Sequence, residues 1–583
     1  MQITRDFSSI GRRHLMEASH RLEVLDPTPE RHGGKPEDTA PRLDTLEGKT
    51  VGLLWNGKAL GDVALKRTAE LISERVPNVT FKFYSGSMPN SPKLLEDLVK
   101  NCDAAIGCTA DCGSCTSWIT HDCVQLERKG KPTVIIASSG FEHDVEASAR
   151  AFAMPDPFYV VVPKVYNNLD QAQAIGQTDP VVDEVISKLV SGATVNRVSS
   201  DGKRNGSWTY TSTDDVNALI DFNQDFLDRD WGDGYPLWPP TRKAVEELIG
   251  GVDGDSDDVV CLLPPGNGEA TVEKVAVNAA MAGCRPEEMP VIMAALRAIA
   301  NIRPVPRGAL MSTSAHAPLV LVNGPLGQSL GINGKRACLG PGKQNAVNIR
   351  ISRAIVCCLK NIGSWTPGVM DLDTIGTTRK HIVVVSENED ESPWEPYHVS
   401  KGFGVSDDAV TVFFTSGEWD ISIQGHVDAQ QLAAAIASFS GGNNSGGYFT
   451  SLGGGAEFSS LGRLLFMPPP HAIPIAEAGF TKQGLEKFMF HQGKEPVSRL
   501  IEPIRKLHKD GKIRPEWEWL FRLSDDEAAR LTLPVIERPE WYSIVVVGSV
   551  RAKDLLMPTR VAPYTEPITQ TPTLTKSSVK SAS

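Results

Sequence analysis

The sequence has no long apolar run, few aromatic residues and no excess of basic residues. No stretch approaches the roughly 18 consecutive apolar residues that a membrane-spanning helix requires. Aromatic residues make up 7% of the chain, and 71 acidic residues outnumber 59 basic ones, for a formal net charge of −12. Because nucleic-acid-binding surfaces concentrate lysine and arginine, the acidic balance argues against nucleic acid as a partner. The lack of a long apolar run argues against a membrane as a partner.

The first twenty residues, MQITRDFSSIGRRHLMEASH, lack the continuous apolar core of a secretory signal. We therefore expect a soluble, cytoplasmic protein, with an organelle-targeting role of this basic, amphipathic segment as the alternative. With 583 residues, 41% of them apolar and 22% charged, the chain is long enough for two or three well-packed domains.

Cysteine is unevenly distributed. Five of the ten cysteines fall between Cys102 and Cys123, and the other five are spread over a much longer span. A secreted disulfide scaffold would be short and rich in cysteine throughout, so this pattern excludes that class. A local cluster in an otherwise ordinary chain indicates redox, nucleophilic or metal chemistry, whereas the scattered cysteines are typical small buried residues.

From Lys49 onward, short apolar strands alternate with segments of helical periodicity. The predicted strands are KTVGLLWNG, VTFKFYSG, DAAIGC, KPTVIIAS and FYVVVP. Such alternation predicts an α/β domain with a parallel, doubly wound, flavodoxin-like sheet. The chain then changes character and predicts a larger, mixed α/β second domain, in which we find no internal repeat.

Composition sets the predicted boundaries. Polar, proline-rich residues 1–45 predict an N-terminal arm, and residues 46–197 the first α/β domain. The polar run at 198–215 predicts a linker, and 216–562 the second domain. Residues 563–583 predict a disordered tail because they are polar and rich in threonine and serine.

The segment GCTADCGSCTSWITHDC joins an apolar strand, a short turn and an amphipathic helix. If the helix begins near Gly113 or Ser114, Cys112 stands at its first turn, where unpaired backbone N–H groups and the helix dipole stabilise a thiolate. Cys115, one turn further on, can close a disulfide with Cys112. The spacing therefore favours Cys112 as the attacking sulfur and Cys115 as the resolving one.

These residues resemble the UGSC-motif family, named for a Sec-Gly-Ser-Cys tetrad that other members carry as Cys-Gly-Ser-Cys. Here the tetrad is Cys112-Gly113-Ser114-Cys115, and the similarity covers most of residues 45–195. The resemblance implies that Cys112 takes the position of a selenocysteine, which suits a nucleophile or redox centre better than packing does. The second half resembles a region that accompanies such domains, through segments such as DGYPLWPPT and LVNGPLGQSLGIN.

A metal centre is the alternative interpretation of the cluster. Cys102, Cys108, Cys112, Cys115 and Cys123 could supply four thiolates to zinc or to an iron–sulfur cluster. Their spacings match no standard zinc knuckle, and Cys102 and Cys108 would lie about 20 Å apart along an extended strand. We therefore expect no cofactor, with zinc or an iron–sulfur cluster as the alternative.

Other candidate residues stand in loops that follow predicted strands, where sites of parallel sheets gather. His143, after KPTVIIAS, is the predicted acid–base residue, and Asn56 and Lys58 are predicted to hold a carboxylate or oxyanion. Six residues in loops of the second domain complete the predicted substrate-binding set: Asn323, Lys343, Asn345, Glu387, Trp394 and His398.

Together these features predict a thiol-dependent enzyme whose site lies at the junction of the two domains. Cys112 and Cys115 would act on a small, anionic organic molecule, as an oxidoreductase or as a transferase or lyase of C–S or other C–X bonds. A thiol reductant is the further partner that this chemistry needs. The sequence names neither the substrate nor the reductant, and it leaves the oligomeric state open, a homo-oligomer included.

Overall fold

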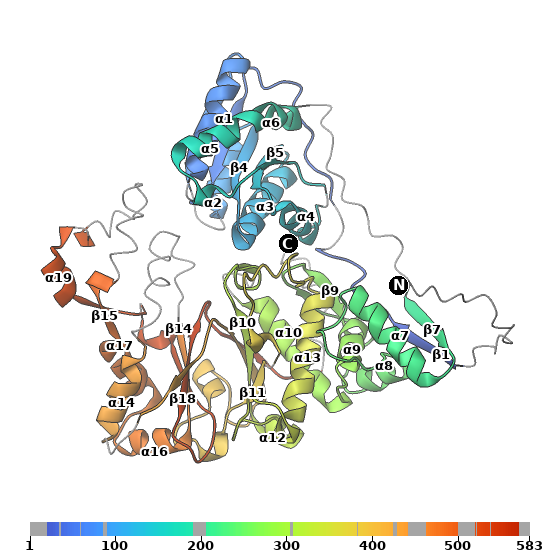
Figure 1. Cartoon of the computed structure of the whole chain (residues 1–583), viewed down its shortest axis with the longest axis vertical. Helices are drawn as coiled ribbons and strands as arrows, with labels where there is room; N and C mark the ends of the chain where they lie inside the picture. The colour runs from blue at the N-terminus through green and yellow to red at the C-terminus, as the bar shows by residue number, and fades with distance from the viewer. Residues whose placement is uncertain are drawn as a thin grey trace, which may run out of the picture.

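The computed structural model describes residues 20–33, 37–58, 60–85, 90–154, 156–190, 206–302, 307–381, 383–423, 428–440, 462–499, 519–520, 522–536 and 538–570. The chain is mixed α/β, and the first domain lies over one end of the larger second domain (Figure 1). Within these residues, no helix combines the length and the apolarity needed to cross a bilayer.

The first domain is a parallel sheet of five strands, as the alternation of strands and helices predicted. Its strands are β2 Thr50–Trp55, β3 Thr80–Ser85, β4 Ala104–Ala110, β5 Thr133–Ser138 and β6 Tyr159–Val162. They lie in the order β3-β2-β4-β5-β6, and every neighbouring pair is parallel. This is the flavodoxin-like order, in which the direction of winding reverses between β2 and β4.

Helices cover both faces of this sheet because its strands are apolar on both sides. One face packs against α1 Gly61–Arg75, α5 Gln171–Thr178 and α6 Val182–Leu189. The other face packs against α2 Pro92–Asn101, α3 Gly113–Arg128 and α4 Glu142–Ala151. The sheet is therefore doubly wound, and its carboxyl edge is the place where α1, α3 and α4 begin.

A buried carboxylate ties the segment before the sheet to this domain. Glu127 of α3 accepts hydrogen bonds from the N–H and the hydroxyl of Thr133, from the N–H of Ala40 and from the Arg42 guanidinium, at 2.5 to 2.8 Å. The Arg42 and Glu127 side chains are only 8% and 4% exposed. Such a pair is costly to break, because removing one partner leaves the other charge buried.

The first described residues, from His20 onward, belong to the second domain rather than to a free arm. β1 His20–Leu25 pairs antiparallel with β7 Ser207–Ser212, and its Val24 packs in one core with Phe222 and Phe226 of α7 Asp215–Asp228. The first domain is thus inserted between two strands of the second.

The predictions of an arm over residues 1–45 and of a linker over residues 198–215 are wrong where β1 and β7 form. Local polarity predicted irregular chain, but a partner strand distant in sequence decides whether such segments pair. The other parts of those two predictions include residues outside the described ones, namely 1–19, 34–36 and 198–205.

The main sheet of the second domain is built from two copies of one unit. In each copy a strand pairs in parallel with a second strand and antiparallel with a third: β10 with β11 and β12, and β14 with β17 and β18. A strand following each third strand crosses to the other copy, since β13 pairs with β18 and β19 with β12. The bounds are β10 Ala317–Asn323, β11 Val384–Ser386, β12 Ala409–Thr415, β13 Trp419–Ile421, β14 Gly462–Met467, β17 Tyr542–Val546, β18 Asp554–Thr559 and β19 Tyr564–Pro567.

The strand register reveals a pseudo-twofold axis between the two copies. Thr415 of β12 and Thr559 of β18 are paired with each other. The backbone hydrogen bonds on either side obey the same symmetry: Ser416 N–H to Pro558 O at 3.0 Å, and Arg560 N–H to Phe414 O at 2.9 Å. The expectation of no internal repeat is therefore wrong, because the copies share topology and register rather than recognisable sequence.

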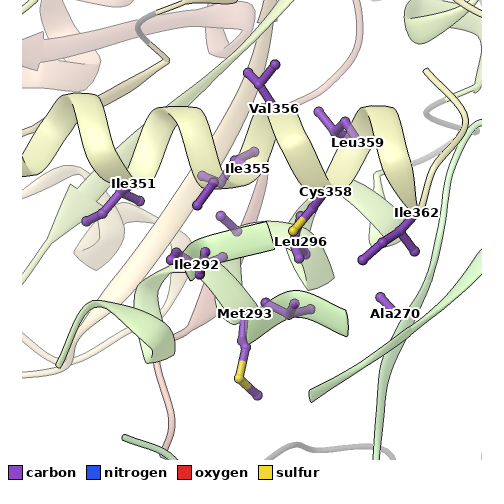
Figure 2. Packing of buried hydrophobic residues seen from close by; sticks show 14 of the residues in the cluster. Ala270, Ile292, Met293, Leu296, Ile351, Ile355, Val356, Cys358, Leu359 and Ile362 are labelled. Atoms are coloured by element: carbon purple, nitrogen blue, oxygen red, sulfur yellow. The ribbon is translucent and has the colours of Figure 1, made fainter. Parts of the chain in front are cut away.

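The two copies share one apolar layer and carry separate helices. Residues at equivalent register positions meet in the shared layer, Leu319 with Leu464 and Val385 with Val545 among them. The first copy packs against α10 Met289–Asn301 and α13 Ala346–Asn361, and Figure 2 shows Cys358 of α13 within this packing. The second copy packs against α14 Ala429–Ser438, α16 Pro469–Glu477 and α17 Lys482–Gln492.

Smaller elements complete the described fold. A hairpin of β8 Val259–Leu263 and β9 Gly268–Thr271 leads into α9 Val272–Met281, which follows α8 Arg242–Ile249. The remaining described helices and strands are α11 Arg307–Leu310, α12 Pro325–Leu330, α19 Asp525–Arg530, β15 Lys494–Pro496 and β16 Thr532–Pro534.

The predicted disordered tail begins too early. Residues 564–567 form β19, and the Thr565 hydroxyl lies 2.9 Å from that of Thr411 on β12. The polar composition predicted disorder because it does not register an available sheet edge. Residues 571–583 of that prediction lie outside the described residues.

Replacing Glu127 tests the buried anchor of the first domain. We expect Glu127→Ala to lower the free energy of unfolding by about 3–5 kcal/mol, because Arg42 and three other donors lose their acceptor. Urea unfolding of the full chain, followed by circular dichroism, measures the change. Glu70→Ala is the control, since Glu70 is 63% exposed in its pair with Arg67 and should change stability by less than about 1 kcal/mol. Equal effects of the two substitutions would contradict the assignment.

Candidate active site

Cys112 and Cys115 lie where β4 leads into α3, as the sequence predicted. Cys112 is extended, with φ −159° and ψ 159°, and is the N-cap residue of α3. Its Sγ accepts a hydrogen bond from the Cys115 N–H at 3.4 Å. The two sulfurs form a disulfide, with the Cα atoms 5.3 Å apart. Cys112 is partly exposed and Cys115 is buried, so Cys112 carries the more accessible sulfur.

The pair stands at the point where the winding of the first sheet reverses, the usual ligand site of this architecture. Asn56 joins the two loops there: its Nδ2 donates to Thr109 O at 2.8 Å, and its Oδ1 accepts from the N–H groups of Thr109 and Lys58 at 3.2 and 3.3 Å. Asn56 is 2% exposed. The structure thus gives this predicted substrate-binding residue a loop-holding role, while Lys58 stays partly exposed.

Buried polar side chains gather at the ends of β4 and β5 and on the first turns of α3. Asp111, directly before Cys112, is only 3% exposed. Among the described residues of these elements, five buried atoms have no hydrogen-bond partner: Thr109 Oγ1, Thr116 Oγ1, Trp118 Nε1, Thr120 Oγ1 and Ser138 Oγ. Packed interiors rarely leave so many polar atoms unpaired, so the arrangement suits a site that holds water or a polar molecule.

The first turn of α4, which follows β5, exposes one predicted residue and buries its neighbour. The side chain of His143 is 84% exposed and lies 3.7 Å from Glu146. Asp144 is 1% exposed, and burial, with a smaller effect of Glu142, raises its pKa to about 8. A buried carboxyl that keeps its proton at neutral pH fits a proton donor better than the exposed His143 does. The sequence did not distinguish these adjacent residues.

The second domain approaches the start of α3 directly. A Cβ on Gly113 would collide with the carbonyl oxygen of Met311 and with Leu372 Cδ1. Met311 also packs in one cluster with Ala151 of α4 and with Met370. Because glycine has no Cβ, the tetrad lets the second domain's backbone lie beside the cysteine pair.

Two segments of the second domain meet Gly113, one at Met311 and the other at Leu372. Polar side chains follow both segments: His316 follows the first and Arg379 the second. The Thr374 N–H donates to Thr313 O at 3.1 Å, which ties these segments together. His316, shortly after Met311, is 5% exposed, and neither ring nitrogen has a hydrogen-bond partner among the described residues. Burial is the main cause that lowers the pKa of His316 to about 3. His316 is therefore neutral at physiological pH.

Two arginines lie near His316, at the pseudo-twofold axis. Arg379 donates to Thr415 Oγ1 at 2.6 Å and to Ala315 O at 3.0 Å. Arg560 directly follows Thr559, and no described residue pairs with its guanidinium. Burial lowers the pKa of both guanidinium groups. Glu418 and Asp373 act on the charge of Arg379, whereas burial is the one cause given by the surroundings of Arg560; a charge held away from water in this way favours an anionic ligand. The sequence analysis missed these residues because only the folded chain brings them together.

The six predicted substrate-binding residues of the second domain lie elsewhere. The seven residues of β10 span about 23 Å, and they lead from the side of Met311 to Asn323. Figure 1 places α12, which follows Asn323, at the far end of the second domain from α3. The expectation that these loops face the cysteine loop is therefore wrong. The domains meet instead on the amino-terminal side of β10.

At that far end, two predicted asparagines stabilise loops. Asn323 Nδ2 donates to Glu387 at 2.6 Å and to Glu389 at 2.8 Å. Asn345 Nδ2 donates to two backbone carbonyl groups at 2.5 and 2.6 Å. Both asparagines are completely buried. Their side-chain N–H groups tie loops together, while Asn323 Oδ1 has no hydrogen-bond partner among the described residues.

The other predicted residues at this end of the second domain either contact neighbouring parts of the same domain or are exposed to solvent. Trp394 Nε1 donates to Phe480 O at 2.8 Å, and its ring packs on the core of the second copy. His398 is completely buried, with Nε2 3.0 Å from Gly404 O. Lys343 is exposed to solvent.

The five clustered cysteines do not converge on one point. Among the described residues, the one group that could hold a metal ion is Asp111, Cys112 and Cys115, whose ligand atoms lie within 4.8 Å of one another. The other three thiols of the cluster lie outside this group, and burial raises the pKa of each: Cys102, Cys108 and Cys123.

Comparison with known proteins bears on the first domain. Residues 23–191 match the model of the UGSC family. This part of the chain belongs to the UGSC family. The matched UGSC segment contains the first domain and its cysteine pair, and it ends before the main sheet of the second domain. Neither the curated proteins nor the solved structures contain a match to the chain.

Asp144 of the UGSC segment should make stability depend on pH. Its folded-state pKa of about 8 exceeds the ordinary value of 3.8, so the unfolded chain releases a proton that the folded chain keeps, and stability falls as pH rises between these values. Asp144→Asn removes this dependence. We expect the variant to gain thermal stability over wild type progressively from about pH 4 to pH 8, in paired melting curves. A difference that stays constant over this range would contradict the burial argument.

Proposed function

We propose that the protein is a thiol-dependent enzyme acting on a small organic anion at the junction of its domains. The observation that carries the proposal is a Cys-X-X-Cys pair at the start of α3, covered by the backbone of the second domain at Gly113. Backbone N–H groups at a helix start favour a thiolate. The cover limits access of water and oxidants to that sulfur.

In the reduced pair, Cys112 is the attacking sulfur because it is the more exposed one. Its thiolate would form a bond to an electrophilic carbon of the substrate and displace a leaving group, which departs with the electron pair of the bond that breaks. Cys115 would then attack Cys112, closing the disulfide and releasing the substrate with two more electrons. A dithiol reductant must supply these electrons to reopen the pair. Asp144 is the candidate donor of a proton to the released group.

The cationic side chains support an anionic substrate. Arg379 and Arg560 lie on the part of the second domain that continues from its contact with Gly113, and neutral His316 adds hydrogen-bonding capacity. An anionic group bound there would gain charge-assisted hydrogen bonds in a poorly hydrated setting. This proposal replaces the predicted role of the distant Asn323 and Glu387.

A metal site remains the second candidate, favoured by the proximity of Asp111, Cys112 and Cys115. Three such ligands with an open fourth position are typical of catalytic zinc. Metal analysis of reduced protein, with Cys112→Ser as control, distinguishes the two. Zinc bound in equal molar amount to wild type, and lost in the variant, would favour the metal site.

Thiol labelling tests the nucleophile. We expect iodoacetamide at pH 6 to modify Cys112 of the reduced protein before any other cysteine, read by mass spectrometry. Cys284 is the internal control, because it is also partly exposed but burial raises its pKa well above the ordinary value. Labelling of Cys112 no faster than Cys284 would contradict the proposal.

The same assay tests the anionic preference. Iodoacetate carries a negative charge and iodoacetamide is neutral. The ratio of their labelling rates at Cys112 should exceed the same ratio at a free thiol, because the second domain attracts the negative charge. Arg560→Gln should reduce this preference about tenfold if one charge-assisted hydrogen bond is lost. If this ratio is the same in Arg560→Gln as in wild type, Arg560 is not part of the site. That outcome would not contradict the labelling of Cys112 by iodoacetamide.

A further inference from the structure

A separate cavity lies between the two domains. Its volume is about 230 Å³, and its wall includes Arg150 and Ala151 of α4 together with Asn361 and Met370 of the second domain. Ala151 and Met370 are also the residues that pack against Met311, whose carbonyl group covers the tetrad. An apolar cluster therefore links the wall of this cavity to the residue that covers Gly113. The volume is below the roughly 300–1,000 Å³ of sites for drug-sized ligands, so a smaller molecule would fit.

Among the described residues, one charged side chain in the wall of the cavity has no partner of opposite charge. Lys360 Nζ lies 2.7 Å from Asp230 Oδ1, and Arg229 Nε lies 2.9 Å from Asp225. Arg150 also lines the cavity and is partly buried, but no residue in the described part of the chain pairs with its guanidinium. An arginine in this position favours a carboxylate, which it can bind through two parallel hydrogen bonds.

Asn361 favours a ligand that carries a hydrogen-bond donor. It is 6% exposed, and its Nδ2 donates to Trp231 O at 2.9 Å and to Asn278 Oδ1 at 2.7 Å. Its Oδ1 accepts no hydrogen bond from the described residues. A buried acceptor without a partner is costly, so a ligand with a hydroxyl or amino group would complete it. His32, whose Nδ1 lies 3.0 Å from Gly266 O, is the other titratable residue of the wall besides those named above.

We propose that this cavity binds a small hydroxy- or amino-carboxylate. The carboxylate pairs with Arg150 of the first domain, and the hydroxyl or amino group donates to Asn361 of the second. Such a ligand joins both domains and holds α4 against the second domain beside the covered cysteine pair. The site does not depend on the chemistry of Cys112, and its ligand need not be the substrate.

Titration calorimetry of the full chain with glycerate and with serine tests the proposal. We expect at least one of them to bind, and Arg150→Gln to weaken that binding about tenfold or more through loss of a charge-assisted contact. Arg150→Lys, which keeps the charge, should lose less. Arg75→Gln is the matched control, because Arg75 lies on α1 in a surface pair with Asp183 and does not line the cavity. It should bind as wild type does.

Propionate tests the role of Asn361, since it keeps the carboxylate of glycerate but lacks both hydroxyl groups. We expect it to bind about fivefold more weakly, in line with one hydrogen bond. Three outcomes would overturn the proposal: no binding of glycerate or serine at millimolar concentration, equal binding to wild type and Arg150→Gln, or equal binding of propionate and glycerate. Melting curves verify that each variant is folded.

Discussion

The close approach of the Met311 carbonyl group to Gly113 sets how the two domains meet. A side chain at position 113 would push the second domain away from α3. With glycine there, the second domain covers the start of the helix that carries Cys112. The same contact continues through Met311 to α4 and so borders the cavity between Arg150 and Asn361. Since the first domain is inserted between β1 and β7, the chain enters and leaves it on the side of the second domain.

The internal duplication explains why some buried polar residues are not a site. In the strand register, Asn323 and Glu387 of the first copy correspond to Pro468 and Val547 of the second. One copy therefore holds the end of its strands with a hydrogen-bonded carboxylate, and the other with apolar contacts. Buried polar groups and apolar packing are often interchangeable in this way. The acidic run after β11 thus serves the fold, both within its own copy and through contacts of Glu387 and Asn388 with the second copy, although its composition suggested a ligand site.

Local patterns predicted the first domain and the position of the cysteine pair. Apolar strands and helical periodicity are properties of neighbouring residues, so the order of elements from Thr50 to Leu189 could be predicted from the sequence. Long-range pairing could not. The partnership of β1 with β7, the strand exchange of the two copies and the meeting of His316 with Arg379 and Arg560 all depend on residues far apart in the chain. Burial of Asp144 beside exposed His143 depends on how α4 rotates against its neighbours.

The substrate-binding residues of the second domain were predicted at the carboxyl end of β10, whereas the first domain meets the side of its amino end. This error has a similar cause. Carboxyl ends of parallel strands are the usual location of sites, and the cysteine pair lies at that end of β4. In the second domain the strands of the main sheet run in both directions. The side that meets the first domain is then decided by the contact at Gly113 and not by strand direction.

The most direct test of the account is the ionisation of Cys112 in the reduced protein. Thiolate absorbance at 240 nm, recorded against pH for wild type and for Cys112→Ser, gives the titration of this one sulfur by difference. The account predicts that Cys112 ionises at a lower pH than a free cysteine, for which the midpoint is about 8.5, because it sits at the start of α3. A difference curve with its midpoint at or above the free-cysteine value would contradict the central claim.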